Sequence, residues 1–534
     1  MITLRPYQRE ALDALYSYFE HNGGNPLLSL PTGSGKGVII AAFVQEVFAQ
    51  WPRSRILVLT HVKELIEQNF LQLMRLWPEA PAGIFSAGLH RRDIGDAITF
   101  AGIQSVYRAA HELGSYDLIL IDEAHLLAPK GEGMYRTFLA AMHTLNPATK
   151  IIGLTATPYR LGHGLLHEGE GALFTDIAYE VPIRDLITAG HLAPLTTAPV
   201  RERLHAEGIA KRNGEFVPGA LQDAVDQAPV TQAACAEIVA LGADRRAWLL
   251  FCAGVRHATH VRDELLRLGI PTALVTGETP AAERAGIIRD YRAGSLRALV
   301  NVDVLTTGFD VPHVDCVAML RPTQSPGLYL QICGRGMRTA PGKTECLVLD
   351  FAGNVARHGP VDDVRPPRAP RGQPGGDAPH KKCSQCGAKM HPKSAYCADC
   401  GYVFPDEAAH EATASAQPIL RAEAEAMRYR ELEVRYRRHE KPDAPPSLRV
   451  EYYAGMRVVA REWVCLEHQG YARTKARLWW KRHAGPQNEP PETIDEALDR
   501  TAELAVPREI LVDETQQYPE IRGVIFDERE SDTV

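Results

Sequence analysis

A glycine-rich turn near the start of the chain has the residue types of a phosphate-binding loop. It lies between an apolar run, Pro26–Leu30, and a helix predicted over Lys36–Gln50. Glycines let backbone N–H groups wrap a phosphate, the helix N-terminus adds positive potential, and a lysine there reaches the outer phosphates. A plain strand-to-helix connection is the alternative for such a turn taken alone. The residues that we expect to hold a nucleotide are Pro31, Thr32, Gly33, Ser34, Gly35, Lys36 and Gly37.

An acidic pair follows about 85 residues later, at the end of the apolar run Leu118–Asp122. The Asp122 carboxylate is placed to hold Mg²⁺, and its neighbour Glu123 to orient an attacking water. A solvated strand end is the alternative for one such pair. Because both motifs occur in this order and on the elements that the chemistry needs, together they predict an ATP site with Mg²⁺, in which Lys36, Asp122 and Glu123 are catalytic.

Short apolar runs alternate with amphipathic helices from the start of the chain to about residue 185. Such runs, separated by helices, are typical of a parallel sheet that is covered on both faces. The alternation lapses over 186–230 and then resumes, which predicts a second α/β lobe. The expected strands are Ile56–Thr60, Ile98–Ala101, Leu118–Asp122, Ile151–Ala156, Ala247–Ala253, Thr272–Thr276, Leu299–Val302, Val314–Leu320 and Glu345–Phe351.

Further short motifs, together with the two above, resemble the superfamily-two helicases of the DEAD/DEAH-box type over about residues 1–358. The resemblance implies two RecA-like lobes that clamp ATP and act on nucleic acid. It implies that Thr155-Ala156-Thr157 couples hydrolysis to lobe movement. It assigns Arg5, Gln8, Gly308 and Asp310 to nucleotide binding, with Gln8 reading adenine. It assigns to nucleic-acid binding the residues Thr60, His61, Lys63, Gln104, Ser105, Thr276, Gly277 and Thr306.

The segment Gln331–Arg338 matches the arginine-finger motif of these helicases. Guanidiniums from the second lobe reach the γ-phosphate across the cleft only when the lobes close, and such a finger is worth roughly 10³–10⁵ in rate. A surface helix with two solvated arginines is the alternative. The resemblance therefore adds Gln331, Arg335 and Arg338 to the catalytic residues.

One departure from the family pattern concerns Gly37, where Ser or Thr normally supplies a hydroxyl to Mg²⁺. Two interpretations stay open. Glycine is a tolerated variant, with Asp122 and waters holding the metal, or the metal site is weakened and hydrolysis is slow.

Several stretches look most like the RadD-type bacterial DNA-repair helicase-like ATPases, although related prophage-type helicases share the motor. That resemblance implies action on single-stranded or branched DNA in repair or recombination, and partnership with single-strand-binding protein or a recombinase. The stretches are Leu57–Asn69, Gly153–Gly162, Val300–Pro322 and Leu347–Asn354.

Other functions stay open: a motor subunit of a restriction-type or prophage replication system, an RNA helicase, or a catalytically weak DNA-binding scaffold. A restriction-type nuclease needs a carboxylate two residues before a lysine, and the sequence contains no Glu-x-Lys or Asp-x-Lys. An intrinsic nuclease of that class is therefore disfavoured. RNA remains open because the motor motifs grip the backbone.

Four of the ten cysteines form two Cys-x-x-Cys-Gly knuckles with ten residues between them. Four thiolates at this spacing close a tetrahedral structural zinc site, whereas redox dithiols or idle thiols are the alternatives. The other six cysteines are predicted to be reduced core residues. The expected zinc ligands are Cys383, Cys386, Cys397 and Cys400.

The predicted fold class is α/β, with two RecA-like parallel-sheet lobes, then a small zinc ribbon and a C-terminal α+β domain. The six prolines and four glycines of 359–382 indicate a linker, and Ala408–Arg438 is predicted as a long exposed helix. The expected domains are a first lobe (1–185), an inter-lobe connector (186–230), a second lobe (231–358), the linker (359–382), the zinc ribbon (383–404), a helical connector (405–445) and an accessory domain (446–534).

The segment Tyr471–Arg482 mixes basic and aromatic residues. Such a mixture suits unpaired bases and a phosphate backbone. At helical spacing, however, Tyr471, Leu478 and one tryptophan are predicted to be core residues, with the basic residues on the wet face.

The net charge of −7 implies that any nucleic-acid site is a local basic groove in an acidic body. No apolar stretch reaches the 18 or so residues of a membrane span, and no secretory signal is recognised at the N-terminus. We therefore expect a cytoplasmic protein without a membrane partner.

Overall fold

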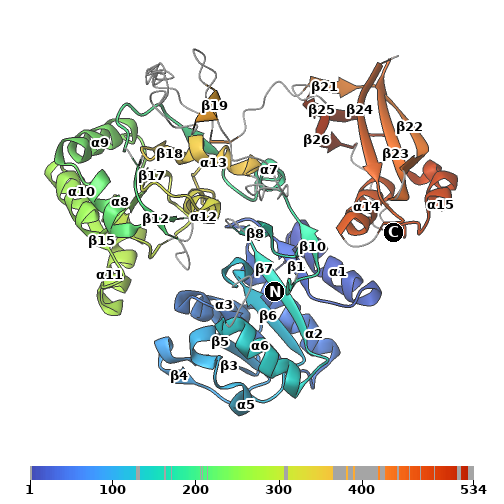
Figure 1. Ribbon diagram of the computed structural model, residues 1–534, viewed down its shortest axis with the longest axis horizontal. Coiled ribbons are helices and arrows are strands. Elements are labelled where there is room, and N and C mark those ends of the chain that lie inside the picture. Colours follow the sequence, from blue (N-terminus) through green and yellow to red (C-terminus); the bar gives the residue numbers. More distant parts are fainter. Residues whose placement is uncertain are drawn as a thin grey trace.

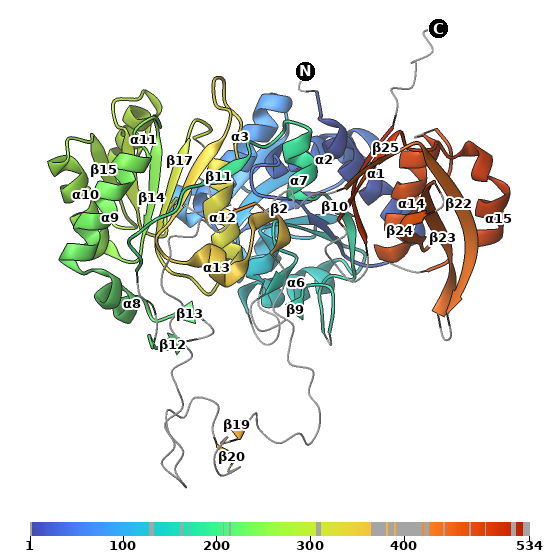
Figure 2. The same ribbon diagram turned by 90° about the horizontal axis from the view of Figure 1, so that it is seen from above.

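The computed structural model has three folded parts: a first lobe, a second lobe and a C-terminal domain (Figure 1). In Figure 2 the first lobe lies between the other two parts. The structure describes residues 3–127, 133–160, 164–169, 171–204, 206, 208–212, 215–305, 311–364, 381–382, 389–390, 419–420, 427–441, 444–455, 457–468, 471–485, 487–513 and 519–526. The predicted zinc ligands and the predicted nucleotide and nucleic-acid residues Thr306, Gly308 and Asp310 lie outside these residues.

The first lobe is built on an eight-stranded sheet of order β10-β1-β7-β6-β2-β5-β3-β4. All neighbouring strands are parallel except β3 and β4, which confirms the predicted parallel sheet. Its strands are β1 (Pro26–Ser29), β2 (Ile56–Thr60), β3 (Ala82–Ser86), β4 (Arg91–Arg92), β5 (Ile98–Gly102), β6 (Leu118–Asp122), β7 (Lys150–Thr155) and β10 (Asp176–Glu180).

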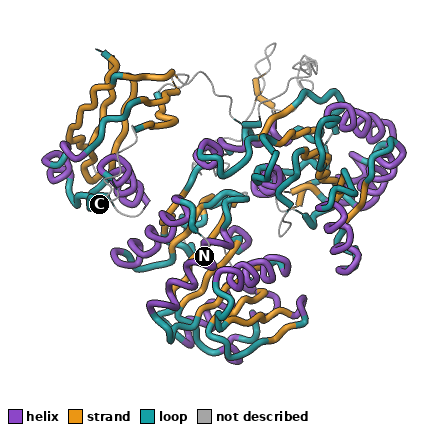
Figure 3. The backbone as a smooth tube through the Cα atoms, turned by 180° about the vertical axis from the view of Figure 1, so that it is seen from behind, coloured by secondary structure: helices purple, strands orange, loops and turns teal. Residues whose placement is uncertain are grey.

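Helices cover both faces of this sheet because alternate residues of its strands face opposite ways (Figure 3). Val58 of β2 faces the cluster that includes the first three helices, whereas Leu57 and Leu59 face the cluster that includes the next three. The helices are α1 (Pro6–His21), α2 (Lys36–Gln50) and α3 (Lys63–Leu76) on one face, and α4 (Ile103–Val106), α5 (Ala110–Leu113) and α6 (Met134–Leu145) on the other.

The second lobe has a six-stranded parallel sheet of order β11-β18-β17-β14-β16-β15. One face is covered by α8, α9 and α10, and the other by α11 and α12. The elements are β11 (Leu195–Thr197), α8 (Pro218–Val225), α9 (Ala228–Leu241), β14 (Trp248–Cys252), α10 (Val255–Arg267), β15 (Thr272–Val275), α11 (Ala281–Arg292), β16 (Ala298–Asn301), β17 (Cys316–Leu320), α12 (Pro326–Gly336), β18 (Cys346–Asp350) and α13 (Asn354–His358).

The predicted inter-lobe connector, 186–230, belongs largely to the second lobe, which corrects the prediction. Its strand β11 pairs with β18, and it contributes buried side chains such as Val200, Phe216 and Leu221 to the core of that lobe. The segment looked polar because these apolar residues are few and widely spaced. A two-stranded pair, β12 (Lys211–Arg212) and β13 (Glu215–Phe216), also lies within it.

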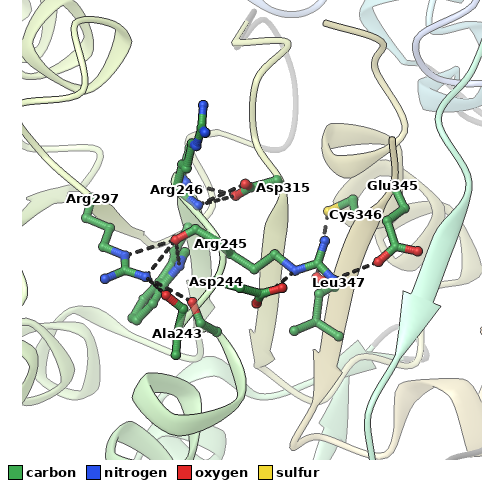
Figure 4. Close-up of polar contacts among 12 residues, drawn as sticks. Ala243, Asp244, Arg245, Arg246, Arg297, Asp315, Glu345, Cys346 and Leu347 are labelled. Atoms are coloured by element: carbon green, nitrogen blue, oxygen red, sulfur yellow. Dashed lines mark hydrogen bonds and ion pairs between the residues drawn. The ribbon is translucent and has the colours of Figure 1, made fainter. Parts of the chain in front are cut away.

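Polar contacts fasten the second-lobe strands at their N-terminal ends (Figure 4). The Arg297 guanidinium donates hydrogen bonds to the carbonyl oxygens of Gly242, Ala243 and Arg245. The Asp315 carboxylate accepts from the backbone N–H groups of Arg246 and Ala247. Parallel sheets bind ligands at the opposite, carboxyl ends of their strands, so this network serves the structure of the lobe.

The C-terminal domain combines antiparallel strands and helices around its own core, in which Trp480 is fully buried. One sheet has the order β22-β23-β24 and the other β21-β25-β26. Helix α14 contacts β10 of the first lobe, which docks the domain on that lobe. The elements are β21 (Met427–Arg430), β22 (Leu432–Lys441), β23 (Ala444–Ala454), β24 (Arg457–Val464), α14 (Tyr471–Ala484), α15 (Ile494–Asp499), β25 (Glu509–Asp513) and β26 (Glu520–Ile525).

The predicted long helix, Ala408–Arg438, is wrong over its described part, where β21 and β22 are strands. The helical connector, 405–445, is therefore partly a piece of the C-terminal domain. Arg and Glu favour helices, but Leu432, Val434 and Tyr436 recur at every second residue, and this period lets a strand bury one face. No helix of the described residues is long and apolar enough to span a membrane.

Candidate active site

A cleft of about 620 Å³ lies between the two lobes and brings most of the predicted catalytic residues together. The phosphate loop and the acidic pair line it from the carboxyl ends of β1 and β6, and residues that follow from α12 line it from the second lobe. The predicted residues along it are Arg5, Thr32, Gly33, Gly35, Lys36, Gly37, Asp122, Glu123, Arg335 and Arg338. Gln331 lies on α12 but is not among the residues that line the cleft.

The phosphate loop depends on two glycines with left-handed backbone geometry. Gly33 has φ of 90°, and Gly35, which precedes the first residue of α2, has φ of 83°. A Cβ on Gly35 would also lie only 2.7 Å from Nε2 of Gln8. The conformation of the loop therefore requires glycine at these two positions. The Lys36 ammonium, which follows the loop, donates a 3.2 Å hydrogen bond to the carbonyl oxygen of Leu30.

The acidic pair is buried at the end of β6, beside the lysine. Nζ of Lys36 lies 3.9 Å from Oε1 of Glu123, and Nδ1 of His125 lies 3.3 Å from Oε2 of the same carboxylate. Burial opposes the ionisation of Glu123, but these two neighbours outweigh it and lower the pKa to about 2. Burial and the charge of Glu123 raise the pKa of Asp122, which is the setting that a bound cation would relieve.

Gly37 packs against the side chain of Asn69, a residue that none of the predicted catalytic motifs included. A Cβ on Gly37 would lie 2.9 Å from Oδ1 of Asn69, and Nδ2 of Asn69 donates a 3.0 Å hydrogen bond to Oδ2 of Asp122. Gly37 lies in the first turn of α2 and is not among the glycines with positive φ. Close packing against Asn69, not an unusual backbone angle, therefore accounts for glycine at this position.

The predicted adenine residues fasten α1 to the phosphate loop. Oε1 of Gln8 accepts from the backbone N–H of Arg5, and its Nε2 donates to the carbonyl oxygen of Ser34 at 3.2 Å. Tyr7 donates to the same carbonyl and its ring packs against that of His191. Tyr7 lies within the predicted adenine motif, between Arg5 and Gln8, whereas His191 is a ring-bearing residue beside it that motif reasoning missed.

Helix α12 of the second lobe approaches the phosphate loop directly. A Cβ on Gly334 would lie 2.5 Å from Cβ of Thr32, and a Cβ on Gly33 would lie 3.5 Å from Cγ of Arg338. Arg335 is buried, and its charge contributes to the lowered pKa of Glu123. The two arginines therefore line the cleft opposite the phosphate loop, and their role as arginine fingers stays a prediction.

Glu215 of β13 holds the start of α12, and no motif pointed to it. Its carboxylate accepts hydrogen bonds from the hydroxyl of Thr323 at 2.7 Å and from the backbone N–H groups of Gln324 and Ser325 at 3.0 Å. The Ser325 side chain in turn caps the helix. The helix that carries Arg335 is therefore anchored at its N-terminus by a carboxylate.

A chain of contacts joins the acidic pair to α12. Nδ1 of His125 lies 3.0 Å from the Thr155 hydroxyl, which donates to the carbonyl oxygen of Thr157. A Cβ on Gly327 of α12 would lie 3.6 Å from the Thr157 hydroxyl. The predicted coupling motif thus lies between the acidic pair and the finger helix.

The predicted nucleic-acid residues of the first lobe lie close together. His61, Lys63 and Gln104 are exposed, and Nε2 of Gln104 donates to the carbonyl oxygen of His61 at 2.9 Å. Ser105 accepts from a backbone N–H of the neighbouring loop, whereas Thr60 is buried.

On the second lobe, Thr276 is buried and Gly277 is exposed. Arg284 donates to the carbonyl oxygen of Thr276 at 3.0 Å and forms a 3.1 Å ion pair with Glu64 of α3. Arg284 therefore bridges the two lobes beside these residues, although no motif included it.

In the basic and aromatic segment of α14, one tryptophan is a core residue, as predicted, and Leu478 is partly buried, whereas the side chain of Tyr471 lies outside the described part of the structure. Trp480 is buried, Trp479 stacks on His483, and Arg473 and Arg477 pair with Glu492.

Comparison with known proteins supports a helicase-type motor built on the two lobes. Residues 1–160 match the family described as the res subunit of type III restriction enzymes, and residues 231–340 match the helicase conserved C-terminal domain. IRC3 of Saccharomyces cerevisiae, named as an ATP-dependent helicase, is 27% identical over 362 residues, which are 66% of this chain and 51% of that protein. Its namesake from Schizosaccharomyces pombe, named as mitochondrial, is 29% identical over 67% of this chain and 58% of its own.

The chain thus spans between 51% and 58% of the length of these two curated relatives. Among solved structures, a fragment assigned to the HsdR subunit of a type I restriction enzyme from Vibrio vulnificus YJ016 shares the fold, with a TM-score of 0.51, 22% identity and 68% of each chain covered. The two matches fall on the two RecA-like lobes, so the chain has the two domain types of a superfamily-two helicase motor and is similar over these lobes to the Irc3 helicases.

Proposed function

We propose that this chain hydrolyses ATP when it binds DNA and uses the cycle to translocate on or remodel DNA in repair or recombination. The observation that carries the proposal is the arrangement of the cleft. A phosphate loop and an acidic pair lie on one lobe, and α12, which carries Arg335 and is followed by Arg338, packs on that loop from the other lobe. Hydrolysis that depends on both lobes is how such motors couple ATP to movement along a strand.

The residues of the cleft fit Mg²⁺·ATP. Gly33 and Gly35 form a cradle that a Cβ would fill, and a buried carboxylate, Asp122, stands beside it. Bound Mg²⁺ neutralises charge on the outer phosphates. Lys36 would hold those phosphates, Asp122 would hold the metal, and the ionised Glu123 would orient the attacking water. Arg335 and Arg338 would stabilise the charge that develops on the transferred group.

ATPase measurements with single-stranded, branched and duplex DNA and with RNA test the proposal. We expect single-stranded or branched DNA to stimulate turnover at least about tenfold, because lobe closure on DNA would place the arginine finger, whose full contribution is roughly 10³–10⁵ in rate. Lys36→Ala and Asp122→Ala should abolish stimulated and basal hydrolysis while circular dichroism stays unchanged. Turnover that no nucleic acid stimulates, or wild-type turnover in either variant, would overturn it.

The RadD-type resemblance and the predicted partners, single-strand-binding protein or a recombinase, extend the same proposal. The support is the likeness of four stretches to those ATPases: Leu57–Asn69, Gly153–Gly162, Val300–Pro322 and Leu347–Asn354. Titration of the ATPase with each purified partner tests it, and a rate unaffected by either partner contradicts it.

A restriction-type motor subunit is the second candidate, favoured by the match of residues 1–160 to the res subunit family. Such a subunit would act with a nuclease on another chain or another part of the protein. If adding restriction subunits from the same organism produced ATP-dependent cleavage of duplex DNA, the result would favour a restriction-type motor over a repair translocase.

A further inference from the structure

One face of the β22–β24 sheet in the C-terminal domain is polar, while the other forms part of the core. Val434, Val450 and Tyr452 point into the core of the domain. The alternate residues of the same strands therefore occupy the opposite face. These residues include Glu433, Arg435, Arg437 and His439 of β22, Arg449, Glu451 and Tyr453 of β23, and Arg461 and Trp463 of β24, and the ring of His439 lies edge-on to that of Trp463.

The strand register arranges this face in rows that cross the sheet. One row consists of Arg437, Arg449 and Trp463, which are successive cross-strand partners. The next row contains Arg435, Glu451 and Arg461. Side chains in such rows are within reach of one another, so the face presents a continuous band of guanidiniums that ends at an indole ring.

Positive charge dominates the face. Its four arginines against two glutamates leave a net charge of +2 in a protein whose net charge is −7. Glu451 is buried, and the guanidiniums of Arg437, Arg449 and Arg461 lie 3.7, 3.5 and 3.0 Å from its carboxylate. Burial opposes its ionisation, but these arginines lower its pKa, so the carboxylate stays charged and orients three guanidiniums.

The same face offers an indole ring to solvent. Trp463 is 49% exposed although it belongs to a sheet, and a large exposed aromatic residue there has no part in the core. The guanidinium of Arg435 lies over the Tyr453 ring, 4.4 Å from its centre. The side chains of Arg435, Arg437 and Arg461 are about half exposed.

Guanidiniums beside exposed rings suit a single strand of nucleic acid. Rings and guanidinium planes stack on unpaired bases, and guanidiniums pair with phosphates. The bases of a duplex are stacked on one another, so their faces are not accessible to an indole. The carboxylates of an acidic peptide would pair with the guanidiniums but would not stack on the exposed indole. The charge and the rings together therefore favour an unpaired strand over both.

We propose that the face formed by Arg435, Arg437, Arg449, Tyr453, Arg461 and Trp463 is a second binding site, for single-stranded DNA, separate from the motor cleft. The choice of DNA rests on the proposed function, whereas the site itself does not. The domain docks on the first lobe through α14 and β10, on the side away from the second lobe (Figure 2). A strand on this face is therefore held while the cleft opens and closes.

Binding of a fluorescent oligothymidylate to the full-length chain, without nucleotide, tests this site independently of ATP hydrolysis. Loss of one stacked base predicts that Trp463→Ala binds about 5- to 100-fold more weakly, and Trp463→Phe should restore most of the affinity. Arg437→Ala/Arg449→Ala should flatten the slope of log K against log salt by about 0.7 for each phosphate that is no longer neutralised, and the corresponding Lys variant should keep the slope.

Matched controls are available on other surfaces. Trp51→Ala removes a tryptophan that is 53% exposed on the first lobe, and Arg267→Ala removes an exposed, paired arginine of α10. Neither control should change the affinity. Photocrosslinking with 4-thiothymidine should label the wild-type chain within 449–463.

The proposal is overturned if Trp463→Ala binds like the wild type, or if the crosslinks lie only in the lobes. Loss of affinity in the arginine variant alone would indicate an acidic ligand and overturn it as well. If Trp463→Ala weakened the binding of an oligouridylate but not that of the oligothymidylate, the assignment to DNA would be overturned. Absence of DNA-stimulated ATPase, by contrast, would count only against the proposed function.

Discussion

Replacing Gly37 by alanine tests whether glycine is present to accommodate Asn69. The added Cβ would lie 2.9 Å from Oδ1 of Asn69, a separation that real Cβ atoms essentially never show. Asn69 must then move, and its hydrogen bond to Asp122 is lengthened or broken. Because that bond is buried and its acceptor is a carboxylate, we expect the free energy of unfolding of the first lobe to fall by about 1.5–3 kcal/mol.

Alanine also favours a helix over glycine by roughly 0.5–1 kcal/mol, which partly masks this loss. A double-mutant cycle with Asn69→Ala removes that term, because the propensity change is the same in both backgrounds. Without the Asn69 oxygen, Gly37→Ala meets no obstacle, so the cycle should show a coupling energy of about 1–3 kcal/mol. The measurement is unfolding by denaturant, monitored by circular dichroism. The transition of the first lobe is recognised as the one that ATP shifts to higher denaturant concentration.

Equal effects of Gly37→Ala in the two backgrounds would refute the reasoning from packing. A magnesium titration of the ATPase gives a second readout. In the Asn69→Ala background, Gly37→Ser offers a hydroxyl where the family pattern has one, so half-maximal activity should require less Mg²⁺ than in Asn69→Ala alone. Titrations that superimpose would show that the missing hydroxyl does not limit the metal site.

Three further predictions concern other parts of the molecule. Arg335→Ala should bind a fluorescent ATP analogue almost normally yet hydrolyse ATP about a thousand times more slowly, and an equal loss of binding contradicts the finger role. Arg297→Ala removes bonds to three carbonyl oxygens and should lower the free energy of unfolding by about 2–4 kcal/mol while ATP affinity is unchanged. Cys383→Ser should release one zinc per chain without changing basal ATPase, whereas no zinc in protein prepared without a chelator would refute the ribbon.

The lobes were predictable because their strands carry a strong local signal. The runs predicted over Ile56–Thr60 and Leu118–Asp122 and the helix over Lys36–Gln50 have the observed bounds. Strands that are buried on both faces consist almost entirely of apolar residues, so the apolar run itself marks the strand. The intrinsic propensities of these residues favour the same structure. In β22, by contrast, the Arg and Glu content suggested a helix, and only the core beneath the sheet decides for a strand.

The candidate site was predictable as far as its residues form short motifs. Lys36, Asp122 and Arg335 each lie in a contiguous segment whose chemistry is legible, and the cleft brings them together. Asn69 and Glu215 gave no such signal, because each acts on a residue that is distant in the sequence. Their roles follow from the packing of helices and lobes, which no local pattern encodes.

The attachment of Glu215 to the start of α12 also makes the arginine-bearing helix observable from outside the cleft. The carboxylate binds the Thr323 hydroxyl and two backbone N–H groups. We therefore expect the strand pair β12–β13 and the helix to move together as a rigid unit. Arg212 is exposed on this pair. A fluorophore attached there, paired with one on the first lobe, would report the approach and withdrawal of Arg335 during each turnover without touching the nucleotide site.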